Sequence, residues 1–455
     1  MTTPTLDAPR PAVVPAEPYV FPPAERRTLA NGLEVVVYDV PGQYVHSVRL
    51  SVPLTLSAEP RDREGVATIM ARTLDEGTAA HTSAEFALLL ERRGVALGAG
   101  ATDAGLSVDV DVAKRHLAYA LDLLRQAVTE PAFPASEVGR HVKQRLAEIE
   151  QERSVAAQRG AIELIARYFD PAERASRPTA GAKETIASIT RDDVVAFHSQ
   201  HVAPVGATVV VAGDLDGVDA FAEIESALGG WAAPSGWEPP AARVAARLAQ
   251  DRVQVFLVDR PGSVQTEFAV ACPGPDRRVQ DGWAPFPVLG FVLGGSPNAR
   301  IDAVLREEKG FTYGIRSVFR PRRRGGMFLT SGSVRGDATV EGLDLLLGIL
   351  DGARDGFRTE EAKQGVDYIA MTAASRYATA DSIADEAASM ALEGLTTEFT
   401  TATLRDLATV DPQRLDAAYR EFVDGRWTVV VVGDAATHAD GIRALGRGDV
   451  TVVTG

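Results

Sequence analysis

The sequence predicts an α+β protein of two homologous halves, each a mixed or antiparallel sheet covered by helices, arranged as a clamshell. Two observations support this expectation. The chain repeats itself at an offset of about 220 residues, and the strand-like and helix-like segments of each copy occur in runs rather than in strict alternation.

Both ends of the repeated unit carry clear matches. An Asp-x-Pro-Gly turn stands near the start of each copy, and a TVVVxGD run stands near its end. Their matching positions lie 220 residues apart: Asp39 with Asp259, Gly42 with Gly262, and Asp214 with Asp434. Matches between these points drift only to offsets of 222 and 223. So small a drift over the length of a domain indicates an ancient duplication.

The first elements of copy one follow from periodicity and helix-end signals. Two Val- and Leu-rich strands flank the Asp-x-Pro-Gly turn. A helix is expected to begin near Glu64, because apolar side chains between Val66 and Leu74 recur on one face. A second helix is expected from Thr82, where Thr82 and Glu85 form a capping box.

The remainder of copy one is a second strand pair, three long helical stretches and a last strand. The helical stretches are expected at residues 114–129, 135–168 and 191–201, and the last strand runs from Thr208 to Ala212. Copy two has the same order of elements.

These patterns divide the chain into four parts. Residues 1–23 are rich in proline and lack an apolar segment flanked by basic residues, which predicts a disordered tail rather than a signal peptide. Residues 24–230 and 251–455 are the two halves. Residues 231–250, rich in Gly, Pro, Ser and Ala, are expected to be a linker that lets the halves face each other.

Composition excludes several classes of function. A net charge of −15 argues against binding to nucleic acid or to an anionic membrane surface. No run of apolar residues is long enough to span a membrane. The single cysteine, Cys272, excludes an internal disulfide framework. A cytoplasmic protein is therefore expected.

The sequence contains no complete metal or nucleophile motif. HExxH, HxxEH and GxSxG are all absent, and only His198 and His201 lie close together. Catalytic zinc needs three protein ligands and a base, so we interpret this pair as surface histidines at a helix end. The glycine-rich turn at Gly294 and Gly295 matches no phosphate-binding loop, which favours a tight turn with close backbone packing.

The segment from Leu293 to Phe319 is the most informative part of the chain. A glycine-rich turn leads into an amphipathic helix that ends at Lys309 and Gly310, and a strand is expected from near Tyr313. Its G-G…L-R-E-x-x-G-x-x-Y pattern resembles the pitrilysin/insulinase family of zinc metallopeptidases, which includes mitochondrial processing peptidase. The resemblance extends over nearly the whole chain from about residue 24, and it includes the doubled architecture.

The resemblance implies roles for Arg306 and Tyr313. In that family an arginine and a tyrosine seven residues apart bind and orient the substrate and polarise the scissile carbonyl. A fixed guanidinium and a phenol that donates to an oxyanion suit these roles. The alternative is structural, with Arg306 at a helix end and Tyr313 packed on a strand.

The resemblance also shows that the zinc set is missing. The positions of the family's HxxEH motif are Thr68, Ala71 and Arg72 in this chain, and Glu148 lies near the position of the third ligand. Arginine cannot be deprotonated and would repel Zn²⁺, so no metal is expected in this chain, and Glu148 is expected to be a surface or salt-bridging residue. The family's substrate-pairing edge strand is also altered, to Gly98–Ala101.

Three hypotheses follow. The first is a non-catalytic, substrate-binding subunit of a heterodimeric zinc metalloendopeptidase, supplying Arg306 and Tyr313 to a homologous partner that carries HxxEH and zinc. Its substrates would be peptides or unfolded short proteins. The second is a structural or binding protein on the same fold, without a catalytic partner. The third is a peptidase active by itself through an unrecognised site. The sequence leaves open whether a pair of subunits is a homodimer or a heterodimer.

Overall fold

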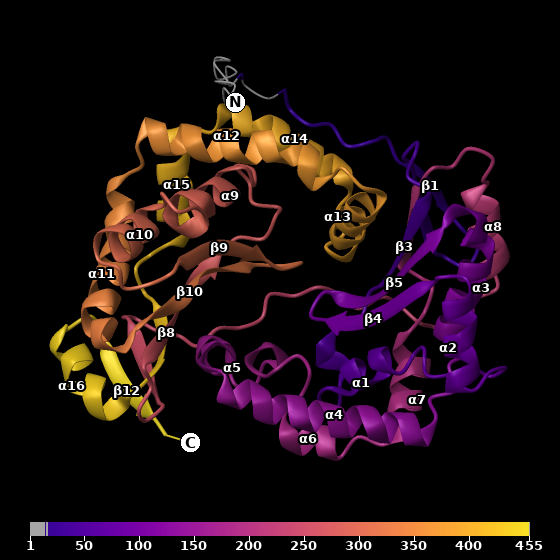
Figure 1. Ribbon diagram of the computed structural model, residues 1–455, viewed down its shortest axis with the longest axis horizontal. Coiled ribbons are helices and arrows are strands. Elements are labelled where there is room, and N and C mark those ends of the chain that lie inside the picture. Colours follow the sequence, from indigo (N-terminus) through magenta and orange to yellow (C-terminus); the bar gives the residue numbers. More distant parts are fainter. Residues whose placement is uncertain (1–13, 15–16, 455) are drawn as a thin grey trace, which may run out of the picture.

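The computed structural model describes residue 14 and residues 17–454 and contains two six-stranded mixed sheets with helices packed on them (Figure 1). The predicted α+β plan of two homologous halves is therefore confirmed. Within the described residues, no helix is both long and apolar enough to cross a membrane. The cytoplasmic location stays a prediction.

The first sheet is built from the first half of the chain. Its strands, in spatial order, are β1 (Glu25–Thr28), β2 (Glu34–Asp39), β6 (Thr208–Gly213), β3 (Val45–Val52), β5 (Gly105–Ala113) and β4 (Ala96–Thr102). β2 and β6 are parallel, and all other neighbours are antiparallel. All of β6 is buried because it lies inside the sheet, and its run of valines suits that position.

The second sheet repeats this order with one difference. Its strands are β12 (Asp449–Val453), β7 (Gln254–Asp259), β11 (Thr428–Gly433), β8 (Gln265–Gly274), β10 (Gly326–Arg335) and β9 (Ile315–Pro321). The outermost strand β12 is parallel to β7, whereas β1 is antiparallel to β2. The predicted strand near Tyr313 begins two residues later, at Ile315.

The helices of the first half agree closely with the sequence pattern. They are α1 (Val66–Arg72), α2 (Ser83–Arg92), α3 (Leu117–Thr129), α4 (Ala135–Ser154), α5 (Ala156–Tyr168), α6 (Lys183–Ala187), α7 (Arg191–His201) and α8 (Ala220–Leu228). The capping box of Thr82 and Glu85 is confirmed. The expected long helix over 135–168 is instead two helices, because Val155 adopts an extended backbone conformation between α4 and α5.

The helices of the second half follow the same plan. They are α9 (Pro285–Gly290), a π-helical turn (Phe291–Gly295), α10 (Arg300–Asp302) with a π-helical continuation (Ala303–Glu308), α11 (Thr339–Gly352), α12 (Thr359–Arg376), α13 (Ala380–Leu392), α14 (Thr397–Asp406), α15 (Pro412–Phe422) and α16 (Ala435–Ala444).

Each half lends one helix to the sheet of the other half (Figure 1). Helix α5 of the first half packs on β8 and β11, where Leu164 and Tyr168 share a buried cluster with Val430 and Val432. Helix α13 of the second half packs on β3 and β6 of the first. The halves are therefore interlocked as well as facing, which the sequence did not predict.

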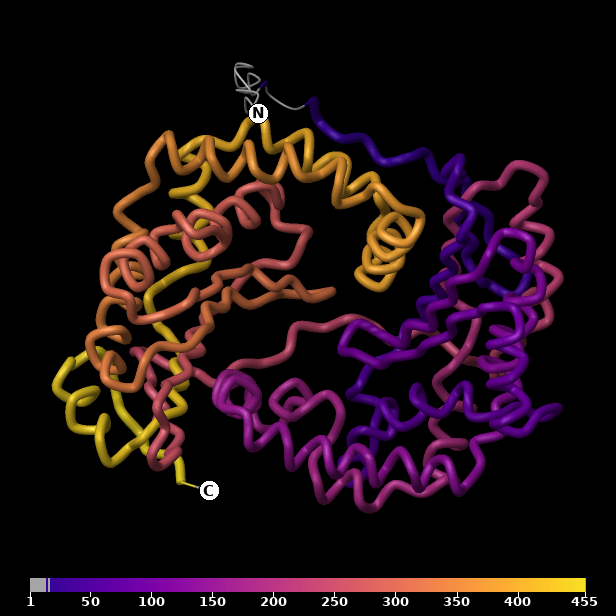
Figure 2. Tube along the Cα trace, viewed as in Figure 1, coloured from indigo at the N-terminus to yellow at the C-terminus, as the bar shows by residue number. Residues whose placement is uncertain are grey.

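The two segments outside the halves are both held by contacts. Residues 1–13 and 15–16 of the predicted tail lie outside the described residues, but the tail's last part is ordered: Phe21 is buried, and the Tyr19 hydroxyl donates to the Tyr377 carbonyl (3.2 Å). The linker crosses between the halves (Figure 2). It pairs with the end of α5, where the amide of Leu248 donates to the Tyr168 carbonyl (3.1 Å).

Candidate functional site

All three positions of the replaced zinc motif lie on helix α1, the third at its last residue. This helix is buried along almost its whole length because Val66, Ile69 and Met70 pack into the core of the first half. Thr68 and Ala71 are buried with them. The Thr68 hydroxyl has no hydrogen-bond partner among the described residues. The position of the family's first zinc-binding histidine therefore carries a buried hydroxyl oxygen that makes no hydrogen bond to the described residues.

The third position is occupied by an ion pair. Both terminal nitrogens of Arg72 donate to the two carboxylate oxygens of Glu148, each at 2.9 Å. Arg145 donates a further bond to Glu148 (3.2 Å). The hydrogen bond from Arg72 is the main cause of a lowered pKa at Glu148, which Arg145 lowers further. Glu148 is therefore a salt-bridging residue, as predicted.

This arrangement does not fit a zinc ion. A guanidinium occupies the place of the second histidine and already satisfies the carboxylate that would be the third ligand. No group of three or more potential ligands gathers anywhere in the part of the chain that the structure describes.

His198 and His201 do not form a site either. His198 donates from Nε2 to the carbonyl of Val128 (2.8 Å) and packs against the ring of Phe133. Burial lowers the pKa of both histidines. The interpretation as surface histidines is thus wrong for His198, which connects α7 to the end of α3.

Arg306 and Tyr313 line one pocket of about 480 Å³. Among the described residues, the ion-pair partner of Arg306 is its neighbour Glu307 alone (3.4 Å), and the side chains of Arg306 and Glu307 are both accessible. The Tyr313 side chain is 93% exposed. Packing therefore cannot account for Tyr313, and the structural alternative is not supported for this residue.

The loop between the two residues is held by the backbone around it. The amide of Phe311 donates to the Leu305 carbonyl (2.8 Å), and the amide of Arg335 donates to the Phe311 carbonyl (2.9 Å). The Thr312 hydroxyl donates to the Ser333 carbonyl (2.6 Å). These bonds fix the loop to β10, so the exposure of Tyr313 is built into a defined turn.

Asp302 is a positioning residue that the sequence did not reveal. It is fully buried, and its carboxylate accepts from the amide of Ile315 (3.0 Å) and from Arg316 (3.0 Å). Asp302 thereby joins the helix that carries Arg306 to the strand that follows Tyr313. A buried carboxylate between two segments could be recognised as a positioning group only from the tertiary contacts.

Gly294 and Gly295 lie at the end of the π-helical turn, directly beside β9. A Cβ atom at Gly294 would lie 2.7 Å from the amide nitrogen of Ser317 and 2.9 Å from the carbonyl oxygen of Ile315. The expected close backbone packing is therefore present, and it brings the turn against the strand that begins after Tyr313.

The altered strand β4 is the edge strand of the first sheet, as the resemblance implies. The turn that follows it touches the second half, because Asp103 pairs with Arg322 of the β9–β10 turn (2.7 Å). An ion pair thus joins the turns at the ends of the two edge strands, β4 of the first sheet and β9 of the second.

Family models match most of the chain. The model described as insulinase (peptidase family M16) matches residues 35–175, and the model described as peptidase M16 inactive domain matches residues 188–367.

The similar sequences include one protein named as a protease and one named as a non-peptidase. An uncharacterized zinc protease of Mycobacterium tuberculosis is 24% identical over 318 residues, covering 67% of this chain and 68% of the relative. A non-peptidase homolog, YmxG, of Helicobacter pylori is 24% identical over 262 residues, covering 57% and 58%.

Two solved structures share the fold. A peptidase M16 inactive domain from Pseudomonas fluorescens has a TM-score of 0.82 at 22% identity, covering 90% of this chain and 98% of that one. A protease from Helicobacter pylori has a TM-score of 0.80 at 16% identity, covering 91% and 100%.

Proposed function

Since this chain belongs to the insulinase family, peptidase family M16, we propose that it is the non-catalytic, substrate-binding subunit of a heterodimeric zinc metalloendopeptidase. The coarser statement, a non-catalytic protein of the M16 fold, follows from the inactive-domain match and the name of the Helicobacter pylori relative. In the finer proposal the partner is a homologous chain that carries HxxEH and zinc. The substrates are peptides or unfolded short proteins.

One contrast carries the proposal. The zinc positions have been converted into buried residues and an ion pair, whereas Arg306 and Tyr313 line a common pocket and Tyr313 is almost fully exposed. An exposed tyrosine adds nothing to this chain's packing. Its place is explained if it acts on a molecule that enters the pocket.

The chemistry assigned to the pair follows from the two side chains. The Arg306 guanidinium is a fixed cation with several donors, so it binds and orients a substrate carbonyl or carboxylate. The Tyr313 phenol donates a hydrogen bond to the oxyanion that develops as the carbonyl is attacked. The partner supplies the zinc ion, the base and the attacking water.

The test is reconstitution with an HxxEH-bearing homologue from the same cell. Neither chain alone should cleave a fluorogenic peptide, and the mixture should. In the mixture Tyr313→Phe should lower kcat by on the order of 100-fold, since one oxyanion donor is lost, with a small change in KM. Tyr44→Phe is the matched control, because Tyr44 is also exposed but lies in the first half.

Two results would contradict the proposal. Unchanged kcat for Tyr313→Phe would remove the assigned role of the phenol. Chelator-sensitive cleavage by this chain alone, with one bound zinc per chain, would favour the third hypothesis.

The alternative function is a structural or binding protein on the same fold. The name of the Helicobacter pylori relative favours it. It predicts that no HxxEH chain co-purifies with this protein and that no mixture gains peptidase activity.

A further inference from the structure

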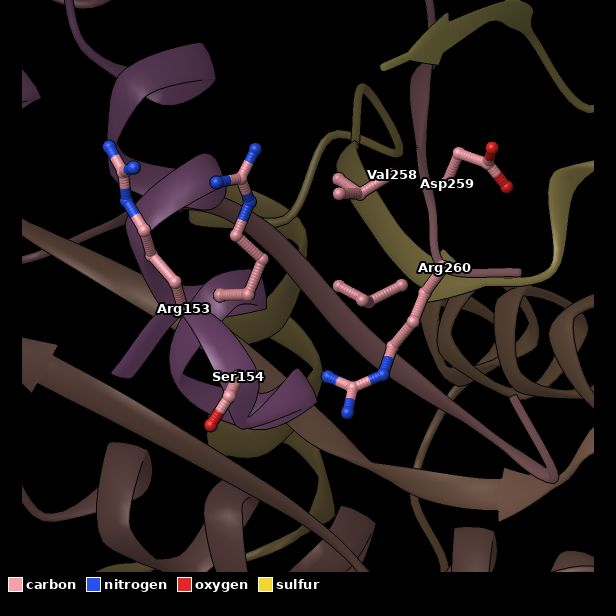
Figure 3. Close-up of a pocket in the computed structure, with 7 residues that line it drawn as sticks. Arg153, Ser154, Val258, Asp259 and Arg260 are labelled. Atoms are coloured by element: carbon pink, nitrogen blue, oxygen red, sulfur yellow. The ribbon is translucent and has the colours of Figure 1, made fainter. Parts of the chain in front are cut away.

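A second pocket, of about 480 Å³, lies between the two halves. Neither Arg306 nor Tyr313 lines it. The turn from α4 to α5 forms one wall, with Arg153, Ser154 and Arg159. The carboxyl ends of β7 and β11 form the other wall, with Val258, Arg260 and Val432. Figure 3 shows Arg153 on one side and Arg260 reaching in from the other.

The pocket carries excess positive charge. Arg159 is paired with Glu163 (2.9 Å), but among the described residues no carboxylate lies within ion-pair distance of Arg153 or Arg260. Asp259 does not compensate, because its carboxylate accepts from the amide of Ala435 (3.0 Å) and points away from both arginines (Figure 3). Arg153 and Arg260, neither of them ion-paired within the described part of the chain, therefore line one concave surface.

The duplication shows what this kind of pocket holds. At the 220-residue offset, Val258, Arg260 and Val432 correspond to Tyr38, Val40 and Ala212 of the first half. There, an extended segment of the chain covers the surface. Phe21 packs against Tyr38 (ring centroids 6.4 Å apart) and against Tyr377 (4.7 Å), which follows α12 as Val155 follows α4.

The second half lacks this cover because the equivalent segment takes another path. The counterpart of the residues around Phe21 is the part of the linker near residue 241. That linker continues to Arg247, which pairs with Phe169 beyond the end of α5. The fold thus builds the same surface twice: one copy is filled by an aromatic extended segment, and the other is open and basic.

We propose that this open pocket, the α4–α5 pocket, binds an extended acidic peptide segment of a protein partner. Extended chain fits because the equivalent surface holds extended chain. Carboxylates fit because arginine binds them through paired hydrogen bonds. The nearby backbone amides of Arg260, Gly262 and Ala435 are already bonded to Gly433, Asp434 and Asp259, so no backbone nest for a free phosphate remains.

The proposed peptide binding is independent of the proposed role in a peptidase, since the α4–α5 pocket uses none of the residues around Arg306. Its test is fluorescence anisotropy of the full chain with a labelled acidic peptide, AEFEDA, and its amide counterpart, AQFQNA. The acidic peptide should bind more tightly, and its affinity should fall as salt is raised. Arg260→Val, which installs the residue of the equivalent position, and Arg153→Gln should each weaken binding on the order of 10-fold.

Arg443→Gln is the matched control, because Arg443 is an exposed arginine on α16, and it should leave binding unchanged. A photoreactive form of the acidic peptide should label the α4–α5 turn, as located by mass spectrometry. Equal binding of both peptides, or unchanged binding by the two pocket variants, would overturn the proposal. So would full competition by inorganic phosphate at the peptide's own concentration, which would indicate a simple anion site.

Discussion

At the scale of single residues, the replaced zinc site is a set of ordinary folding interactions. Arg72 and Glu148 occupy positions assigned to metal ligands by the family resemblance, and they neutralise each other through two parallel hydrogen bonds. Thr68 differs from them, because its hydroxyl is buried without a hydrogen-bond partner in the described part of the chain. Such a group costs free energy in the folded state.

Thr68→Val should therefore stabilise the protein. The exchange keeps the shape of the side chain and removes an unsatisfied buried hydroxyl, so we expect a gain of about 1 kcal/mol in the free energy of unfolding. Urea denaturation at pH 7 measures it. Thr73→Val is the matched control and should lose a similar amount, because the Thr73 hydroxyl donates to the Ile69 carbonyl (2.8 Å). A loss of stability in Thr68→Val would mean that the hydroxyl has a partner after all.

Glu361 illustrates how one carboxylate fixes the helix that leads to Arg306. It accepts from Arg300 through both oxygens (2.9 and 2.7 Å) and from Arg358 (3.0 Å). Burial alone would raise the pKa of Glu361, but the bonds from Arg300 and Arg358 prevail and lower this pKa to about 2. The ionised form is therefore the one that stabilises the fold.

The pH dependence of stability should show this. A lowered folded-state pKa means that the stabilisation is present above the ordinary value of 4.5 and is lost as pH falls toward 2. Glu361→Gln should be less stable by about 2 kcal/mol at pH 7. Its stability should also fall less steeply than wild type between pH 4.5 and pH 2. Parallel curves for the two proteins would contradict the assignment.

At the scale of elements, the exchanged helices decide how the halves are joined. Helix α13 meets β3 and β5 at a buried guanidinium, Arg49, which is 4% exposed. Four carboxylates surround it: Asp109 and Asp111 from β5, and Asp381 and Asp385 from α13. One cation thus holds together four anions from both halves.

Asp109 is the weakest member of this cluster, at 3.8 Å from Arg49. Burial raises its pKa, Arg49 partly opposes this, and the neighbouring Asp385 and Asp111 raise it further. The ionised Asp109 therefore costs stability above its raised pKa. Asp109→Asn should be slightly more stable than wild type at pH 7, by less than about 1 kcal/mol because Asp109 is partly exposed. The difference should vanish as pH falls through the raised pKa toward 3.8.

Arg49→Met is the contrasting variant in the same thermal and urea measurements. It leaves four carboxylates without their cation and should lower the free energy of unfolding by about 3 kcal/mol. A destabilised Asp109→Asn, or a neutral Arg49→Met, would show that the cluster does not join the halves in this way.

At the scale of the whole molecule, the exchange of α5 and α13 makes the halves one unit. Each sheet has an apolar face that packs against a helix from the other half, α13 on the first sheet and α5 on the second. Either half alone would expose that apolar face to water. The linker adds one further connection but is not what holds the halves together.

Splitting the chain in the linker after Gly236 should therefore leave the two pieces associated. We expect them to elute together in gel filtration and to unfold in a single thermal transition. The first half produced by itself should aggregate or remain unfolded. Separate elution of two folded pieces would show that the exchanged helices contribute little to the association.

The sequence by itself determined the duplication, the order of elements, and the chemical nature of the replaced zinc positions. It did so because strand and helix periodicity and the pattern of matched residues are local properties of the chain. The exact capping box at Thr82 and the helix over 191–201 were predictable for the same reason.

Only the tertiary structure decided which residues meet. The pairing of Arg72 with Glu148, the buried Asp302 beneath β9, the helix exchange and the α4–α5 pocket all join residues that are distant in the sequence or lie in different halves. Their energies come from burial and geometry in the folded chain, which no local pattern encodes. The two copies of the module have similar sequence patterns, yet one surface is covered by Phe21 and the other is left open, because the path of the linker is settled only when the whole molecule packs.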